Sequence, residues 1–162
     1  MCEKLDFDYL ISGNHTLFLD DKGENIAEFY DVLNFPVEDQ KAMIKRHFQT
    51  IIKVIESGLF DFVAHLDYAR KHPLCGKDDF IDEKIQVIES LAKHQTAAEI
   101  STKGLRKDND FYPDEKLLKK AIEKGVKFVI SDDAHHIDEL GYNFEQAEKA
   151  LLENNCCNRF SL

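Results

Sequence analysis

The chain has 162 residues, 43% of them hydrophobic, and its 31 acidic and 21 basic residues give a formal charge of −10. This length fits one domain with a packed core, so we expect a single domain spanning residues 1–162. The acidic balance, with no basic stripe, disfavours nucleic-acid binding, because phosphate backbones would be repelled. No apolar run reaches the ~18 residues that a membrane-spanning helix needs.

The cysteine spacing favours free thiols. The four cysteines are Cys2, Cys75, Cys156 and Cys157, and their spacing fits neither a zinc knuckle nor a disulfide framework. Free thiols are typical of a reducing compartment. We therefore expect a soluble, cytoplasmic protein with neither nucleic acid nor a membrane as partner.

Short apolar runs alternate with amphipathic helical patterns. The runs occupy residues 7–12, 60–64, 96–100 and 126–130, and such runs are typical of buried strands. The predicted helices are residues 38–57 before Gly58, residues 81–93, a segment with Pro113 as its first residue and Gly125 at its end, and a segment capped by Asn143 with Gln146. This alternation predicts an α/β fold with a parallel sheet. It does not separate an open doubly wound sheet from part of a (β/α) barrel.

Histidine follows three of the four predicted strands, and aspartate follows two of these three. His15 follows the first run, His65 and Asp67 follow the second, and Asp133 and His135 follow the fourth. Functional groups gather at the carboxyl ends of parallel strands. Imidazoles and carboxylates are ligands of first-row metals, and their convergence would be costly without a cation. The joint pattern predicts a metal site.

The other candidate histidines occupy ordinary structural positions. His47 falls within a predicted helix, His94 follows the end of one, and His72 precedes a proline. We do not expect these three residues to bind metal.

Four segments of the chain resemble one family. They read FDYLISGNHTLF, FDFVAHLDYARK, AEISTKGLRK and GVKFVISDDAHHIDELGYNFEQA. In order and spacing they are similar to the polymerase-and-histidinol-phosphatase (PHP) superfamily, and within it to the histidinol-phosphate phosphatases. The resemblance implies a distorted (β/α)7 barrel with up to three divalent metals at its mouth. This chain would form about four strand–helix units, a partial (β/α)7-type barrel.

The same resemblance implies roles for individual residues. His15 and His65 would bind one metal together, Asp133 a second and His135 a third. Arg106 resembles the family's phosphate-binding arginine, a role that suits its planar bidentate donor. The alternative for Arg106 is a solvated loop cation. Asp67 would orient an imidazole from outside the ligand set.

The activity implied by the resemblance is hydrolysis of a small phosphorylated substrate. Specifically, L-histidinol phosphate and water would give L-histidinol and phosphate, a step of histidine biosynthesis. Asp133, His135 and Arg106 would be the catalytic residues. The metal would be Zn, Mn or Fe, because His/Asp sites accept each of them. Bound metal would also let an acidic chain receive an anion.

The sequence departs from the family pattern at its start. The family's His-x-His pair, a further histidine and a bridging glutamate are not found, and Glu3 lies too close to the first predicted strand to match that glutamate. We expect an N-terminally incomplete PHP-like domain, through truncation, through dependence on a second copy or partner, or through loss of catalysis. An incomplete barrel leaves a strand edge open, which favours self-association.

Two other functions remain open at this point. The chain would be a catalytically incomplete PHP-like module that binds a partner or phosphorylated ligand. Alternatively, it would be a phosphatase for another monoester, such as a phosphotyrosine.

Overall fold

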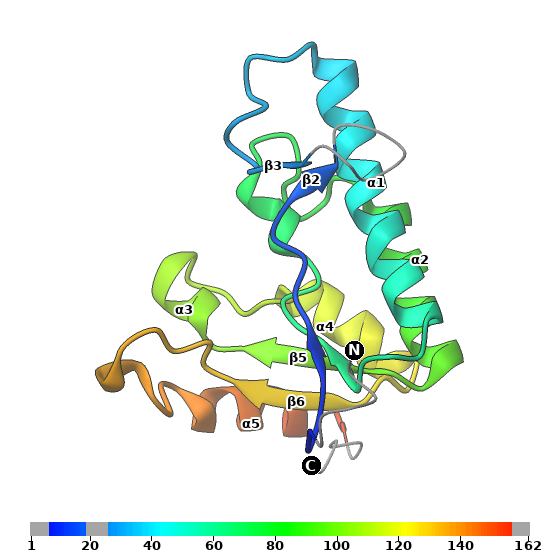
Figure 1. The fold of residues 1–162 in the computed structure, drawn as a ribbon. Coiled ribbons are helices and arrows are strands. Elements are labelled where there is room, and N and C mark those ends of the chain that lie inside the picture. The colour runs from blue at the N-terminus through cyan, green and yellow to red at the C-terminus, as the bar shows by residue number, and fades with distance from the viewer. Residues whose placement is uncertain (1–6, 19–25, 157–162) are drawn as a thin grey trace.

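A parallel sheet of four strands forms the centre of the fold (Figure 1). The computed structural model describes residues 7–18 and 26–156, so the predictions on Cys2, Glu3 and Cys157 lie outside the described residues. The strands are β1 (Ile11–Ser12), β4 (Phe62–Val63), β5 (Ala97–Ser101) and β6 (Phe128–Ser131). Each lies within or overlaps one predicted apolar run, and the predicted parallel α/β sheet is confirmed.

The strand order distinguishes the two architectures that the sequence left open. The sheet runs β1-β4-β5-β6, so neighbours in space are also successive strands of the sheet along the chain. A doubly wound sheet reverses direction at a switch point, whereas a (β/α) barrel adds each strand beside the last. The described sheet therefore has the strand succession of part of a (β/α) barrel.

The predicted helices are present near their predicted bounds. They are α1 (Val37–Glu56), α2 (Ile81–His94), α4 (Glu115–Glu123) and α5 (Phe144–Glu153), joined by the short α3 (Lys103–Lys107) and the 3-10 turns η2 (Tyr68–Lys71) and η3 (Ile137–Glu139). Figure 1 shows α1 and α2 side by side, with α4 and α5 against the sheet. Their apolar faces share one core with the strands, and burial of that surface drives the packing.

Two predicted helix starts differ from the structure. Pro113 is not the first residue of α4, because the carboxylate of Asp114 caps this helix by accepting the backbone N–H of Leu117 at 3.0 Å. Asn143 does precede α5, but it has a left-handed backbone and makes no side-chain cap hydrogen bond. Asn143 is therefore the N-cap residue of α5, as predicted, but its side chain makes no capping hydrogen bond.

A second, antiparallel sheet was not predicted. It pairs β2 (Leu17–Phe18) with β3 (Ile26–Ala27), and two-residue strands show no periodicity that sequence could reveal. Leu17 is fully buried against the core, which fixes the segment just after His15. In the described ranges, no helix is long and apolar enough to cross a membrane. Cys75 is a buried free thiol, as predicted, and Cys156 is also buried.

His47 fixes the same segment from α1. Its Nδ1 lies 3.2 Å from the carbonyl oxygen of Thr16, and its ring packs edge-on against Phe29 and Phe48. The imidazole is fully buried, its Nε2 has no hydrogen-bond partner, and burial lowers its pKa to about 4. His47 therefore has a structural role and stays neutral at neutral pH.

The depressed pKa of His47 predicts a loss of stability in acid. The folded-state pKa lies below the unfolded value of about 6.5, so the unfolded chain binds more protons between pH 6.5 and 4. Protonation should therefore lower the free energy of unfolding by about 3 kcal/mol as the pH falls through this window. In His47→Gln, which keeps a donor for Thr16 but cannot titrate, urea denaturation from pH 7 to pH 4 should show a correspondingly shallower loss.

The exposed His94 provides the control for this experiment. His94→Gln should retain the wild-type pH dependence, because this imidazole is solvated. Identical pH profiles for His47→Gln and the wild type would contradict the assignment.

Candidate functional site

Two imidazoles from different strand ends meet at the carboxyl edge of the sheet. The Nε2 atoms of His15 and His65 lie 2.8 Å apart, and their ring centroids lie 4.6 Å apart. Tyr68 stacks on His15 at 4.8 Å and also contacts His65. Gly13 permits this approach, since a Cβ at this position would lie 3.2 Å from Cε1 of His65. The structure thus brings together the two residues predicted to share a metal.

The His65 ring is neutral at neutral pH. Burial, and then the neighbouring His15, lower the pKa of His65 to about 4. Its Nδ1 is buried and has no hydrogen-bond partner, so Nε2 is the atom that faces the site. A neutral imidazole with a free ring nitrogen is the form that binds a metal.

Two of the predicted site residues have a left-handed backbone. His65 has φ 30° and Asp133 has φ 48°. Residues with a side chain rarely adopt this conformation, although histidine and aspartate do so more often than most. Such strain is retained where the surroundings fix it and is common at functional sites.

Glu99, in the central strand β5, holds both of these residues. Its Oε2 accepts the backbone N–H of His65 at 2.8 Å, and its carboxylate also accepts a hydrogen bond from the Ser131 hydroxyl. The Oγ of Ser131 in turn accepts the backbone N–H of Asp133 at 3.1 Å. Glu99 therefore connects the ends of β4 and β6, on either side of its own strand.

Glu99 is not among the site residues that the sequence predicted. Burial raises the pKa of this carboxyl to about 7, and the charge of Asp133 adds to that rise, while the bonds from Ser131 and His65 oppose it. The sequence signal was a single acidic residue inside the apolar run at residues 96–100, which is buried along its whole length. An ionisable residue in a buried strand is rare unless it has partners.

Asp133 is paired with a cation from the chain itself. The Nζ of Lys103 lies 2.7 Å from Oδ2 of Asp133 and 3.4 Å from Nδ1 of His135. His135 is more exposed, and its Nδ1 lies 2.9 Å from the Asp133 carbonyl oxygen. Asp133 and His135 therefore lie together, as predicted, with the ammonium of Lys103 against both.

Arg106 lies apart from this cluster. Its guanidinium donates to the carbonyl oxygen of Asp132 at 3.0 Å and to the carboxylate of Glu139 at 3.3 Å, and it lies 5.1 Å from the ring centroid of Tyr142. These contacts hold the loop after β6. The Nε of Arg106 has no hydrogen-bond partner among the described residues, and a phosphate contact by this guanidinium stays a prediction.

Asp67 contacts no imidazole among the hydrogen bonds of the described residues. Its buried carboxylate pairs with Arg70 at 3.2 Å and accepts the backbone N–H of Asp114 at 3.0 Å. Burial raises the pKa of Asp67 to about 6, and the charge of Arg70 opposes this rise. In the structure Asp67 joins the end of β4 to the start of α4.

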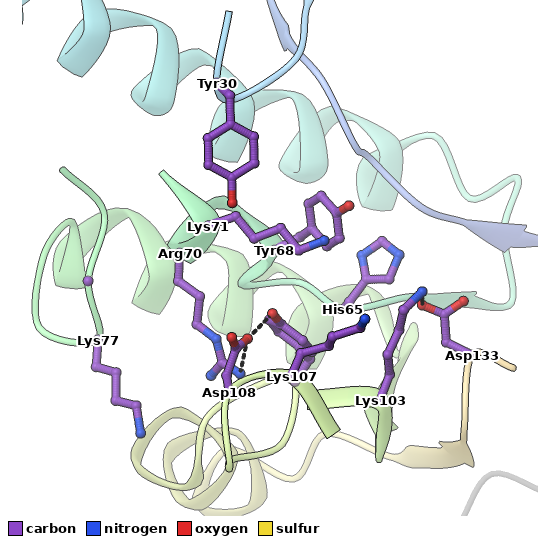
Figure 2. Close-up of a pocket in the computed structure, with 12 residues that line it drawn as sticks. Tyr30, His65, Tyr68, Arg70, Lys71, Lys77, Lys103, Lys107, Asp108 and Asp133 are labelled. Atoms are coloured by element: carbon purple, nitrogen blue, oxygen red, sulfur yellow. Dashed lines mark hydrogen bonds and ion pairs between the residues drawn. The ribbon is translucent and has the colours of Figure 1, made fainter. Parts of the chain in front are cut away.

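A pocket of about 620 Å³ opens beside His65 and Asp133 (Figure 2). Lysine and arginine side chains from several segments surround it, and tyrosine rings form much of its apolar wall. Its charged lining comprises the cations Arg70, Lys71, Lys77, Lys103 and Lys107 and the anions Asp108 and Asp133. Cations therefore outnumber anions here, in a chain whose overall charge is −10. Such a pocket attracts a small anion.

The donor set suits a divalent cation at the imidazole pair. Both Nε2 atoms face one point, and His65 is neutral, as metal binding requires. In the part of the chain that the structure describes, however, no group of three or more histidine, cysteine or acidic side chains is arranged to hold a metal. The Asp133 carboxylate, a further predicted ligand, forms an ion pair with Lys103.

Curated proteins similar to this chain agree with the resemblance that the four segments show. The chain is 29% identical over 149 residues to a probable histidinol-phosphatase of Deinococcus radiodurans, covering 91% of this chain and 55% of that protein. It is 30% identical over 155 residues to a probable histidinol-phosphatase of Thermotoga maritima, covering 92% and 57% respectively. The chain thus spans somewhat over half the length of these relatives. No protein-family model matches it.

A solved structure shares the fold. It is the histidinol phosphate phosphatase of Lactococcus lactis, complexed with zinc, L-histidinol and phosphate. The TM-score is 0.63 and the sequence identity is 17%. The match covers 94% of this chain and 59% of that one. The chain is therefore similar in sequence to probable histidinol-phosphatases and shares the fold of one, in agreement with the resemblance that the motifs showed.

Proposed function

We propose that this chain forms the metal-binding part of a PHP-type phosphoesterase that hydrolyses a small phosphate monoester, with L-histidinol phosphate as the preferred substrate. The observation that carries the proposal is the imidazole pair of His15 and His65 beside a pocket with a positive surplus. The names of the relatives, and the ligands of the Lactococcus lactis enzyme, support the same substrate.

In this proposal each site residue has a distinct task. His15 and His65 hold a divalent metal through Nε2, while Asp133 and His135 serve two further metal positions. The metal is Zn, Mn or Fe, and when bound it supplies a hydroxide near neutral pH and neutralises charge on the phosphoryl oxygens. Lys71 and Lys107, which form no ion pair in the described part of the chain, draw the anion into the pocket.

The missing family residues limit what this chain does alone. The sequence contains no His-x-His pair and no counterpart of the bridging glutamate, and the described residues form no complete ligand group. We propose that a complementary half supplies the remaining ligands, and that the chain by itself binds metal weakly. A catalytically incomplete module that binds phosphorylated ligands is the second candidate, favoured by the contact of Lys103 with Asp133.

Metal analysis tests the site assignment. The wild-type chain, dialysed against Zn²⁺ and then against metal-free buffer, should retain more zinc than His65→Ala, because that variant loses one of the two facing nitrogens. Asp133→Ala should also lose zinc. His94→Ala removes an exposed imidazole elsewhere and should match the wild type. Equal zinc content in all four proteins would remove the site assignment.

Substrate preference distinguishes the two candidate functions. With Zn²⁺ or Mn²⁺ present, the chain should release phosphate from L-histidinol phosphate slowly, but faster than from phosphotyrosine or 4-nitrophenyl phosphate. His65→Ala should reduce this release to background, because the metal position is lost. Binding of L-histidinol phosphate by calorimetry without any phosphate release would favour the binding module. Faster release from phosphotyrosine would change the proposed substrate.

We further propose that the chain associates with a second copy through β1. This strand pairs only with β4 among the described strands, and Tyr9 and Ile11 beside its open edge are 41% and 46% exposed. Open strand edges carry unpaired backbone groups that can pair with another chain.

Sedimentation tests this association. The wild type should form dimers at micromolar concentration, and Ile11→Lys should shift the equilibrium to monomer, because a charge at the strand edge opposes pairing. Ile137→Lys, at an 87% exposed position in η3, should leave the dimer intact. A wild type that stays monomeric throughout would overturn the proposal.

A further inference from the structure

The ammonium of Lys103 lies against two residues of the loop that follows β6. It lies 2.7 Å from Oδ2 of Asp133 and 3.4 Å from Nδ1 of His135. Its charge also lowers the pKa values of His65 and Glu99. One lysine therefore supplies positive charge to two carboxylates and lies near two imidazoles.

The fold holds this ammonium in place. Lys103 is the first residue of α3, two residues after the end of β5. Its backbone N–H donates to Oγ of Ser101, the last residue of β5, at 3.4 Å. Its side chain is 19% exposed and that of Asp133 is 27% exposed. Figure 2 shows Lys103 extending toward Asp133 along the wall of the pocket. A partly buried pair of this kind is screened less by solvent than a surface pair.

We infer that Lys103 competes with a divalent cation for the carboxylate of Asp133, so that metal binds this carboxylate only when the ammonium leaves. A metal bound to Oδ2 of Asp133 would use the lone pair that now faces Nζ. Nδ1 of His135 donates to the carbonyl oxygen of Asp133 at 2.9 Å, so it is not the atom that the ammonium blocks. Carboxylate oxygens and imidazole nitrogens bind zinc at about 2.0–2.2 Å. Two cations that close to one carboxylate would repel each other, so the two states exclude one another.

Lys103 thus supplies at Asp133 the kind of positive charge that a bound metal would supply. Without it, Asp133 would face the neighbouring carboxylate of Glu99 with no compensating cation. With Lys103 in place, the charge of Asp133 is compensated in the metal-free protein, and the affinity of Asp133 for a metal is lower. The inference rests on the proposed function only in that the site takes a divalent metal.

Zinc binding by Lys103 variants provides the first test. In calorimetric titrations with Zn²⁺, Lys103→Met should bind at least about tenfold more tightly than the wild type, because Asp133 is then free. Lys107→Met is the matched control: it removes the same charge from the same pocket, but Lys107 has no hydrogen bond or ion pair to Asp133 in the described chain. This control should stay within about twofold of the wild type. Circular dichroism would confirm that all three proteins are folded.

The outcomes separate this inference from the proposed function. If His65→Ala abolishes zinc binding while Lys103→Met and the wild type have equal affinity, the metal site stands and the competition is refuted. If none of the proteins binds zinc, both ideas fail. Equal tightening in Lys103→Met and Lys107→Met would reduce the effect to net charge and would also refute the inference.

Linkage requires the reverse effect as well. A metal that displaces Lys103 must make its amine more accessible, since the coupling between two bound species is reciprocal. Acetylation of Lys103 in the wild type, followed by mass spectrometry, should therefore become faster when Zn²⁺ is added, while acetylation of Lys107 should not change. No change in the Lys103 rate at saturating zinc would contradict the displacement.

Discussion

The carboxylate of Glu99 is the constraint on which the site depends. It lies in the central strand β5, is 4% exposed, and bonds to the backbone of His65 on one side and to Ser131 on the other. Through Ser131 it also reaches the backbone of Asp133. Burying a carboxyl without partners is costly, so these hydrogen bonds and the packing of three adjacent strands depend on each other. The left-handed backbones of His65 and Asp133 are retained because Glu99 fixes both.

The charge distribution follows from the same arrangement. Acidic residues dominate the chain, yet the pocket beside His65 has more cations than anions in its lining. Arg70 is held there by Asp67 and stacks on Tyr112 at 3.9 Å, while Lys71 stacks on Tyr68 at 3.8 Å. The cation–π contact orders Lys71 without neutralising its charge. An anion can therefore approach a site whose immediate ligands are themselves neutral or negative.

Local patterns in the sequence predicted the strands and most helix bounds, and with them the convergence of His15 with His65 and of Asp133 with His135. They failed where a contact depends on the direction of a side chain and not on its position at a strand end. Lys103 and Asp133 are separated by 30 residues, and nothing in the run around Lys103 indicates that its ammonium faces that carboxylate. Pro113 failed for a local reason: the carboxylate of Asp114 offers a better cap than a proline start.

The short helix α3 explains how the site can exchange one cation for another without losing its shape. Lys103 and Arg106 lie three residues apart on this helix, and both contact the loop after β6. Arg106 holds Asp132 and Glu139, and the Glu139 carboxylate also accepts the backbone N–H of His135 at 2.8 Å. If Lys103 moves away, these contacts still fix the loop and the direction of Asp133. Arg106 thus fixes the loop, whereas Lys103 supplies positive charge to Asp133. A metal ion would therefore take the place of Lys103 and leave Arg106 where it is.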